Sequence, residues 1–249
     1  YTWTNPVVIP NGAITGASSQ GTGQTSISQT LTNLTHSAAT VTYTVTPTAG
    51  ICSGSTFTIV VTVNPMPDVI TTPPSQSVCS GTATSIALTS NVIGTSFSWT
   101  VSQSGATGAT ASSGSSIAQT LTATGNAPGS VTYTVTPSAN GCTGNPITVI
   151  VTVNPIPVAT ASQSPPICSG STTNINLAST VTGSTFSWTV VQSGVTGATA
   201  ASGPSISQTL STTGNSPGTA VYTITPSANG CSGNPITVTV IVNPIPVAT

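Results

Sequence analysis

Five cysteines are the residues of this chain best suited to chemistry, and they stand at positions 52, 79, 142, 168 and 231. Cys52, Cys142 and Cys231 share one place in a repeated pattern, and Cys79 and Cys168 share another. Regularly placed cysteines in a chain of exported character predict disulfide bonds and an oxidising compartment. The sequence contains no CxxC pair and a single histidine, too few ligands for a zinc site, so we expect no metal and no cofactor.

Charged and acid–base groups are almost absent, since the chain has one acidic residue, one histidine and no Lys or Arg. Acid–base catalysis needs positioned groups of suitable pKa, and glycoside hydrolysis needs two carboxylic acids. Asp68 follows a proline in a linker, and His36 stands alone in a loop. Phosphate binding and attraction to anionic membranes both depend on Lys and Arg. We therefore expect no enzyme activity and no nucleic-acid partner.

Membrane insertion is not expected either, because no stretch approaches the roughly 18 uninterrupted apolar residues of a membrane span. Hydrophobic residues make up 36% of the chain and the mean hydropathy is +0.30, which argues against disorder. Val, Ile and Thr are abundant, and these residues favour pleated strands. The composition predicts a soluble all-β protein.

Internal repeats organise the whole chain. VTYTVTP occurs at 41–47 and at 131–137, and it returns as AVYTITP at 220–226, so successive copies are offset by 90 and then 89 residues. The predicted repeats are 1–67, 68–157 and 158–249, the last of which includes the start of a following linker and strand. Asn-Pro-x-Pro closes each copy and predicts stiff, extended joints between the repeats.

Alternation of apolar and polar residues within each copy predicts strands buried on one face. In the segment 147–153, the inward residues are Ile147, Val149, Val151 and Val153. Clusters of Gly, Asn, Pro and Ser separate such segments and supply turns. A unit of about 90 residues with a tryptophan on its third strand matches an Ig-type sandwich. The fold class we predict is all-β, as three tandem Ig-like antiparallel β-sandwiches with the first incomplete.

A recurring set of residues carries a family resemblance. In the second copy it comprises Cys79-Ser80-Gly81, Ile86, Leu88, Phe97, Trp99, Tyr133, Asn140-Gly141-Cys142 and Val153-Asn154-Pro155. This pattern resembles the PKD-like and Ig-like repeats of large secreted Bacteroidota surface proteins. The resemblance implies a sandwich array displayed at a bacterial cell surface as an adhesin stalk or fibre. PKD domains carry acidic loops and these copies carry none, so a calcium-stiffened form is not expected.

The pairing of the cysteines stays open at this point. Equal spacing favours bonds inside each repeat, namely Cys79–Cys142 and Cys168–Cys231. The turns that carry these residues lie at opposite ends of an Ig sandwich, whereas half-cystines need Cα atoms within about 7 Å. In a head-to-tail array those ends meet between neighbours, which favours a junction bond such as Cys79–Cys231. Free thiols are the third alternative.

The first copy is incomplete. Tyr1 aligns with Phe97, so equivalents of 68–96, which hold the first two strands, are missing. The interior of this copy is then predicted to be an open strand-acceptor groove at Trp3, Ile27, Leu31, Tyr43 and Val45. The missing strands come either from adjacent repeats of a longer chain or from a neighbouring copy by β-augmentation. Both alternatives leave an open-ended unit, as filaments require.

Surface positions add two further predictions. Most outward residues are Thr and Ser, with Val60, Ile150 and Ile241 as apolar exceptions at matching places on the last strand, and we predict lateral contacts there. Asn33 begins an Asn-Leu-Thr acceptor for glycosylation, so glycans are a further expected partner.

Together these observations predict a structural extracellular protein at the cell surface. It would form a stiff stalk or filament by end-to-end association with copies of itself or with adjacent repeats. The alternative is a ligand- or glycan-binding adhesin module. Such a module needs a loop unlike its counterparts, and the six-residue insertion between Trp3 and Ile27 is the candidate.

Overall fold

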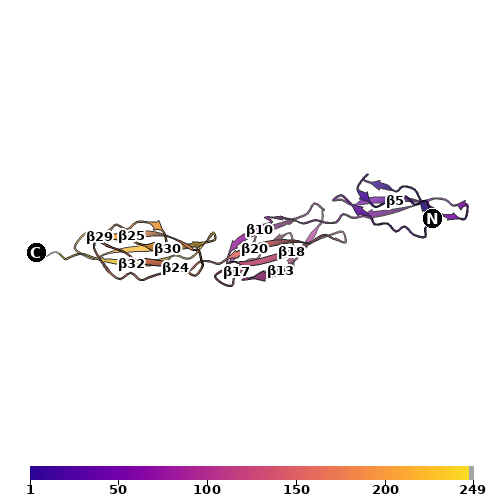
Figure 1. Cartoon of the computed structure of the whole chain (residues 1–249). Helices are drawn as coiled ribbons and strands as arrows, with labels where there is room; N and C mark the ends of the chain where they lie inside the picture. Colours follow the sequence, from indigo (N-terminus) through magenta and orange to yellow (C-terminus); the bar gives the residue numbers. More distant parts are fainter. Residues whose placement is uncertain (247–249) are drawn as a thin grey trace.

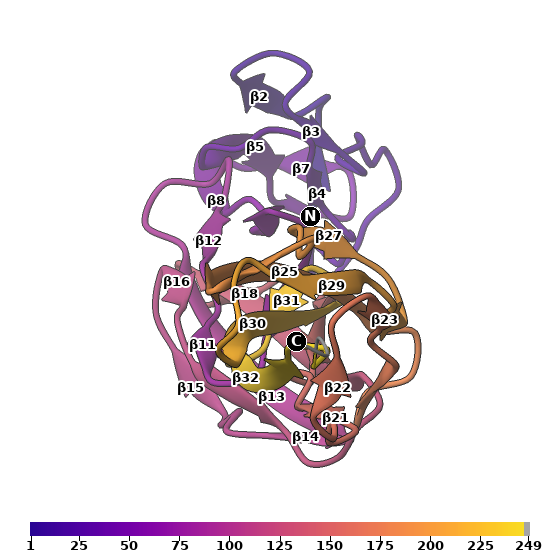
Figure 2. The same ribbon diagram turned by 90° about the vertical axis from the view of Figure 1, so that its left-hand side faces the viewer.

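Three β-sandwich modules follow one another along an extended rod (Figure 1). The computed structural model describes residues 1–246. We name the modules repeat 1 (1–67), repeat 2 (68–157) and repeat 3 (158–246). Viewed from the C-terminal end, the repeats lie one behind another, with repeat 1 displaced to one side (Figure 2). Within the described residues every regular element is a strand. No helix long and apolar enough to cross a membrane occurs among them. The predicted all-β class is confirmed.

Repeat 2 contains both layers of the sandwich and serves as the reference. Its strands are β9 (Ile70–Thr72), β10 (Ser75–Cys79), β11 (Thr82–Ala83), β12 (Ile86–Thr89), β13 (Ser96–Ser104), β14 (Ala106–Thr107), β15 (Ser112–Ser113), β16 (Ser116–Ile117), β17 (Thr120–Ala123), β18 (Gly129–Ala139), β19 (Cys142–Thr143) and β20 (Ile147–Asn154).

The larger sheet of repeat 2 has the order β10-β20-β18-β13-β15, and β19 pairs with β18. The facing layer consists of two three-stranded groups, β16-β12-β9 and β11-β17-β14. Alternate residues of the long strand β18 point into the core, which is why Val131, Tyr133 and Val135 are all 0% exposed. Trp99 packs among them as predicted from its place on β13.

The first strand of repeat 2 changes sheets, a feature that the alternation of residues did not predict. β9 pairs antiparallel with β12, and β10 then crosses to lie parallel to β20, with Cys79 opposite Asn154. This crossing shields the outer edge of β20. It also carries Cys79 to the end of the module that faces repeat 3.

Repeat 3 has the same arrangement, with the order β22-β32-β30-β25-β27 in its larger sheet. Its strands are β21 (Ala159–Ala161), β22 (Ile167–Cys168), β23 (Ser171–Thr172), β24 (Ile175–Ser179), β25 (Thr185–Ser193), β26 (Val195–Thr196), β27 (Ala201–Ser202), β28 (Ser205–Ile206), β29 (Thr209–Thr212), β30 (Gly218–Ala228), β31 (Cys231–Ser232) and β32 (Ile236–Asn243). The predicted start of a following strand at 247–249 lies outside the described residues.

In repeat 1 only one of the two layers contains long strands. Its strands are β1 (Thr2–Trp3), β2 (Val7–Ile9), β3 (Ile14–Thr15), β4 (Thr32–Asn33), β5 (Ala39–Thr46), β6 (Thr48–Ala49), β7 (Cys52–Ser53) and β8 (Phe57–Val63). The central strand β5 pairs with β1 and β2 on one side and with β8 on the other. Counterparts of β9, β10 and β12 would align with positions before Tyr1.

Candidate functional site

The last strand of repeat 1, β8, exposes apolar side chains that its counterparts bury. Ile59 is 38% exposed, whereas Val149, at the same place in β20, is 0% exposed. Phe57 is 43% exposed as well. Two more valines of β8 are half-buried while their counterparts in β20 are fully buried, namely Val61 and Val63 against Val151 and Val153.

Missing neighbours explain this exposure. In repeat 2 the inward residues of β20 share one hydrophobic core with Ile86 and Leu88 of β12 and Ile117 of β16, and the outer edge of β20 pairs with β10. Within residues 1–246, β8 pairs with β5 alone. An apolar strand with a free edge is a template for another strand. Burial of each exposed aliphatic side chain would be worth about 1.5–3 kcal/mol.

A hollow of about 150 Å³ lies beside β8, and its lining includes Trp3, Ile27, Val45, Phe57 and Ile59. Three of these belong to the acceptor groove predicted from the sequence. The other two lie on β8 and were not among the predicted residues. An alignment of β8 with β20 could have predicted these two residues. The inward side chains of β20 are covered by strands whose counterparts would precede Tyr1.

Part of the predicted groove is closed, which corrects the expectation of an open core around Trp3, Tyr43 and Val45. These side chains are only 6%, 1% and 2% exposed. The segment between β2 and β4 folds over them: the indole Nε1 of Trp3 donates to the Ser18 carbonyl at 2.9 Å. The Tyr43 hydroxyl donates to Gln29 Oε1 at 2.8 Å.

The exposed apolar surface of repeat 1 therefore consists of β8 together with Ile27 and Leu31, which are half-buried. Their counterparts, Ile117 and Leu121, are 0% exposed in repeat 2. The open region of repeat 1 thus lies beside β8, and the side chains near Trp3 form its floor.

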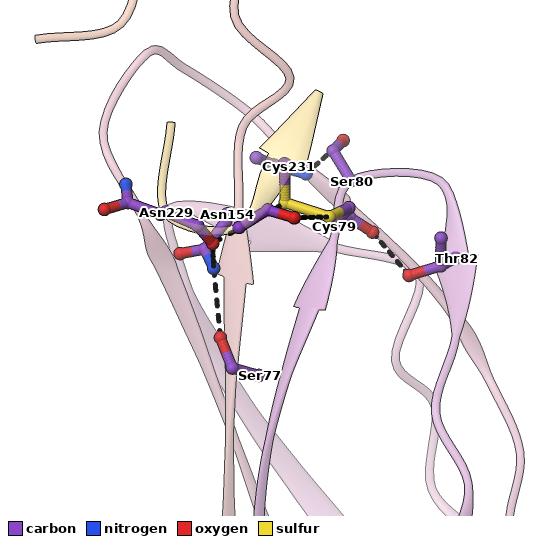
Figure 3. Close-up of a disulfide and its surroundings, with 9 residues drawn as sticks. Ser77, Cys79, Ser80, Thr82, Asn154, Asn229 and Cys231 are labelled. Carbon is purple, nitrogen blue, oxygen red and sulfur yellow. Dashed lines mark hydrogen bonds between the residues drawn. A yellow bond between two sulfur atoms is a disulfide. The ribbon is translucent and has the colours of Figure 1, made fainter. Parts of the chain in front are cut away.

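The junction between repeats 2 and 3 is the second candidate site (Figure 3). A disulfide joins Cys79, at the end of β10, to Cys231 in β31, with the Cα atoms 5.7 Å apart. Beside it, the side-chain amide of Asn154 donates to the Asn229 carbonyl at 3.1 Å and to Ser77 Oγ at 3.0 Å. The repeats are thus linked covalently and by hydrogen bonds across a short linker.

This bond decides between the alternative pairings. The structure contains the junction pair and neither of the pairs proposed inside single repeats, Cys79–Cys142 and Cys168–Cys231. In repeat 2, Cys79 lies opposite Asn154 at the end facing repeat 3, while the turn that carries Cys142 packs against the linker from repeat 1. The two thiols are therefore at opposite ends of one sandwich. Cys52, Cys142 and Cys168 are free in the described residues.

The junction between repeats 1 and 2 has the same packing. The side-chain amide of Asn64 donates to the Asn140 carbonyl at 3.0 Å, as Asn154 does to Asn229. A Cβ at Gly144 would collide with the carbonyl oxygen of Pro67, and Gly233 stands in the same relation to the Pro157 carbonyl. Glycine is needed at both places because the linker backbone lies directly against the turn.

The predicted glycosylation site lies at a side chain that is already hydrogen-bonded. Asn33 is half-buried, and its Nδ2 donates both hydrogens, to the Ser37 carbonyl at 2.8 Å and the Val63 carbonyl at 2.7 Å. A glycan on this nitrogen would displace one of these bonds.

The three predicted lateral-contact residues are all exposed: Val60 61%, Ile150 51% and Ile241 42%. Val60 and Ile150 occupy equivalent positions. Ile241 does not, because the counterpart of Ile150 in β32 is Thr239, and Ile241 lies two residues further along the strand. Only Val60 and Ile150 are therefore at matching places.

The single acidic side chain makes hydrogen bonds that hold the linker in place. Asp68 accepts hydrogen bonds from Ser90 Oγ at 2.6 Å and from the backbone and side chain of Asn91 at 2.8 and 2.6 Å. These bonds, the one from Ser90 foremost, lower the pKa of Asp68. They fasten the linker to the turn after β12. Within residues 1–246 no three His, Cys, Asp or Glu side chains gather as metal ligands would.

Each repeat also buries a tyrosine on its central strand. Burial raises the pKa of Tyr43, of Tyr133 and of Tyr222, the last to about 12. Each hydroxyl donates to a glutamine at 2.8–3.0 Å, namely Gln29, Gln119 and Gln208. The three repeats thus share the same buried hydrogen bond between tyrosine and glutamine.

These features define a class: tandem Ig-like β-sandwich modules joined end to end through short linkers. The model of the PKD-like domain matches residues 1–67, 76–157 and 165–246. The chain therefore belongs to the PKD-like domain family, as the sequence pattern indicated. Among curated proteins, no sequence matches it.

Several solved structures match the chain at low sequence identity. Mouse clustered PcdhgC3 EC1-3 is 8% identical, with a TM-score of 0.38, over 84% of this chain and 77% of that chain. Chicken CNTN1 FN1-FN3 is 10% identical, with a TM-score of 0.34, over 97% and 88%. Mouse Cadherin-23 EC22-24 is 14% identical, with a TM-score of 0.31, over 99% and 86%.

Proposed function

We propose that this chain is a structural protein of the bacterial cell exterior that forms a stiff stalk or filament by end-to-end association of its repeats. The repeated junction packing supports stiffness, because the same contacts recur between repeats 1 and 2 and between repeats 2 and 3. The disulfide supports an oxidising location outside the cytoplasm. The family resemblance supports a Bacteroidota surface as the setting.

Completion of repeat 1 by added strands is part of the proposal. The observation that carries it is the exposure of Ile59, 38% against 0% for Val149 in the completed repeat 2. The incoming strands repeat the roles of β10 and β12: one lies parallel to the free edge of β8, and the other covers its inner face. Main-chain hydrogen bonds would give affinity, and alternate apolar side chains would give register.

Assembly is favoured over the adhesin alternative. The exposed groups of the open face are aliphatic and aromatic side chains of β8, which match another strand better than a polar ligand. A glycan-binding role would instead depend on the inserted segment between Trp3 and Ile27. Lateral contacts through Val60 and Ile150 remain a proposal for bundling of such filaments.

A chain with its own missing strands tests the proposal. A second copy of residues 68–96 is placed directly before Tyr1, since Tyr1 aligns with Phe97. We expect the parent chain to form fibres of constant width in negative-stain images and the extended chain to lose strand exchange at β8. In dilute, monomeric protein, amide hydrogen exchange of 57–63 should slow to the rate of 147–153 only in the extended chain.

The matched control carries the same extension with Ile86→Ser and Leu88→Ser in the added copy. These changes keep the length of the extension and remove the two side chains that cover the core. The control should leave β8 exposed. Equal protection of 57–63 and 147–153 in a monomeric parent chain would contradict the proposal.

A further inference from the structure

The disulfide at the junction gives tension a short covalent path through repeats 2 and 3, which lie in line along the rod (Figure 1). It joins Cys79 to Cys231 across a sequence separation of 152 residues. A pull applied to the chain before Cys79 and after Cys231 therefore passes directly from one sulfur to the other. Residues 80–230 form a closed loop beside this path, so a pull cannot draw them out while the bond is intact.

In repeat 2 the path runs from Asp68 to Cys79 and crosses the whole module. Asp68 follows the linker from repeat 1 and accepts a hydrogen bond from Ser90 Oγ at 2.6 Å, in the turn after β12. Cys79 lies at the other end of the module, opposite the last residue of β20, Asn154. Most of this segment consists of β9 and β10, and strands are close to the full extension of a chain. The path through repeat 2 therefore has little length to release.

In repeat 3 the path runs from Cys231 to Asn243. Cys231 lies at the end nearest repeat 2, where Gly233 packs against the carbonyl of Pro157. Most of the remaining segment is β32, which ends at Asn243. Strand β30 pairs with β32 over seven residues and keeps it extended. A strand thus again carries the path from one end of the module to the other.

The junction shields this bond from exchange with other thiols. Cys231 is 2% exposed and Cys79 is half-buried. Beside them the side-chain amide of Asn154 donates to the Asn229 carbonyl and to Ser77 Oγ, which holds the ends of the two repeats against each other (Figure 3). Because thiol–disulfide exchange requires access to a sulfur atom, this packing protects the bond from reduction.

We infer that the Cys79–Cys231 disulfide is a mechanical lock, which carries force along 68–79 and 231–243 and prevents that force from unfolding the two sandwiches. Without the bond, force would pass through both modules, and their survival would depend on the rate of forced unfolding. With the bond, the folded bodies of both repeats lie outside the path. This function goes beyond end-to-end association, because it acts within a single chain.

The length that the lock protects distinguishes it from the other pairings. The loop of 152 residues corresponds to about 500 Å of extended chain, which stays hidden while the bond is intact. A bond inside one repeat, either Cys79–Cys142 or Cys168–Cys231, would hide only about 200 Å. The length released under force therefore shows which bond is present and what it protects.

The test stretches the 249-residue chain, fused at both ends to disulfide-free handle proteins, by single-molecule force spectroscopy with and without dithiothreitol. We expect the oxidised chain to lengthen by about 200 Å, because only repeat 1, whose Cys52 is free, unfolds. The reduced chain should release about 500 Å more. The double variant Cys79→Ser, Cys231→Ser should give the long release in both conditions. The matched control Cys168→Ser should behave as the parent chain.

Three results would overturn the inference. Equal lengths with and without dithiothreitol would show that no bond protects the two repeats. A difference near 200 Å would place the bond inside one repeat. Release of well over 200 Å by the oxidised chain would show that the path itself is slack. Fibre formation is measured separately on many chains, so either proposal can fail alone.

Discussion

Repeats 1 and 2 have nearly the same sequence pattern but differ in what covers their last strand. In repeat 2, β20 has β10 at its edge and β12 across the core, and Val149, Val151 and Val153 are all 0% exposed. In repeat 1, β8 has neither neighbour within the described residues, and Ile59 is 38% exposed.

The comparison shows which strands of a sandwich keep their structure without the first two strands and which strand depends on them. The pairing of the central strands and the burial of the tyrosine are the same in both repeats. The inner face of the last strand depends on the first two strands. Where those strands are absent from the described residues, one sheet keeps its order and the last strand exposes apolar side chains.

Truncation of matched leucines should give the largest difference between the two repeats. Leu121 is 0% exposed, whereas its counterpart Leu31 is half-buried. We expect Leu121→Ala to lower the free energy of unfolding of repeat 2 by about 2–5 kcal/mol. Leu31→Ala should cost about 1 kcal/mol or less, because less surface leaves contact with the core.

Each repeat has one tryptophan, so urea unfolding can be followed repeat by repeat after the other two are changed to Phe. Equal losses for Leu31→Ala and Leu121→Ala would mean that repeat 1 is closed in solution.

Removal of the junction disulfide should have the next largest effect. The bond between Cys79 and Cys231 spans a sequence separation of 152 residues. Cys79→Ser should destabilise the linked repeats by about 2–4 kcal/mol, since the unfolded chain regains the freedom of a long loop. Cys168→Ser removes an exposed free thiol and serves as the matched control, with no expected change. A denaturation midpoint for Cys79→Ser that equals that of the control would contradict the junction bond.

A substitution at the linker should distinguish the internal junction from the free end. A methyl group at Gly144 would collide with the Pro67 carbonyl, so we expect Gly144→Ala to cost about 1–3 kcal/mol and to bend the rod. Gly54→Ala meets the side chain of Pro47 and no preceding linker, so the reduced monomer should keep its length. Small-angle X-ray scattering measures both. An unchanged maximum dimension for Gly144→Ala would argue against direct contact of linker and turn.

How far the sequence predicts this structure depends on the range of the interaction. The inward positions of β18 and β20 followed from local alternation, and Trp99 followed from its place in the repeat. The change of sheets between β9 and β10 could not be predicted, because both segments alternate alike and only the three-dimensional edge of β20 selects the partner.

The cysteine pairing and the groove needed the same long-range information. Equal spacing favoured Cys79–Cys142 and a head-to-tail array favoured Cys79–Cys231, and the choice depends on which end of a sandwich each turn occupies. The groove was placed around Trp3 and Tyr43 because the sequence did not show that the segment before β4 would cover them. Exposure on β8 could have been predicted by comparison of Ile59 with Val149.

Alkaline titration gives the smallest expected effect. Burial raises the pKa of Tyr222 to about 12, and that of Tyr43 is raised for the same reason. The protonated form is favoured by folding, so this stability is complete below the unfolded pKa near 10 and is lost as the pH rises toward about 12.

Tyrosinate absorbance should show Tyr222 ionising only near pH 12, well above the unfolded pKa near 10. A Tyr222→Phe variant assigns this step. Ionisation of Tyr222 near pH 10 in the folded chain would contradict its burial.

Hydrogen exchange on the unmodified chain tests the central claim most directly. The amides of 57–63 in β8 and of 147–153 in β20 are compared by mass spectrometry in dilute, reduced protein. We predict fast exchange at the outward-facing amides of β8 and slow exchange throughout β20, with β8 becoming protected as chains assemble. Slow exchange in both strands of a monomer would show that repeat 1 seals its own interior, which contradicts the account.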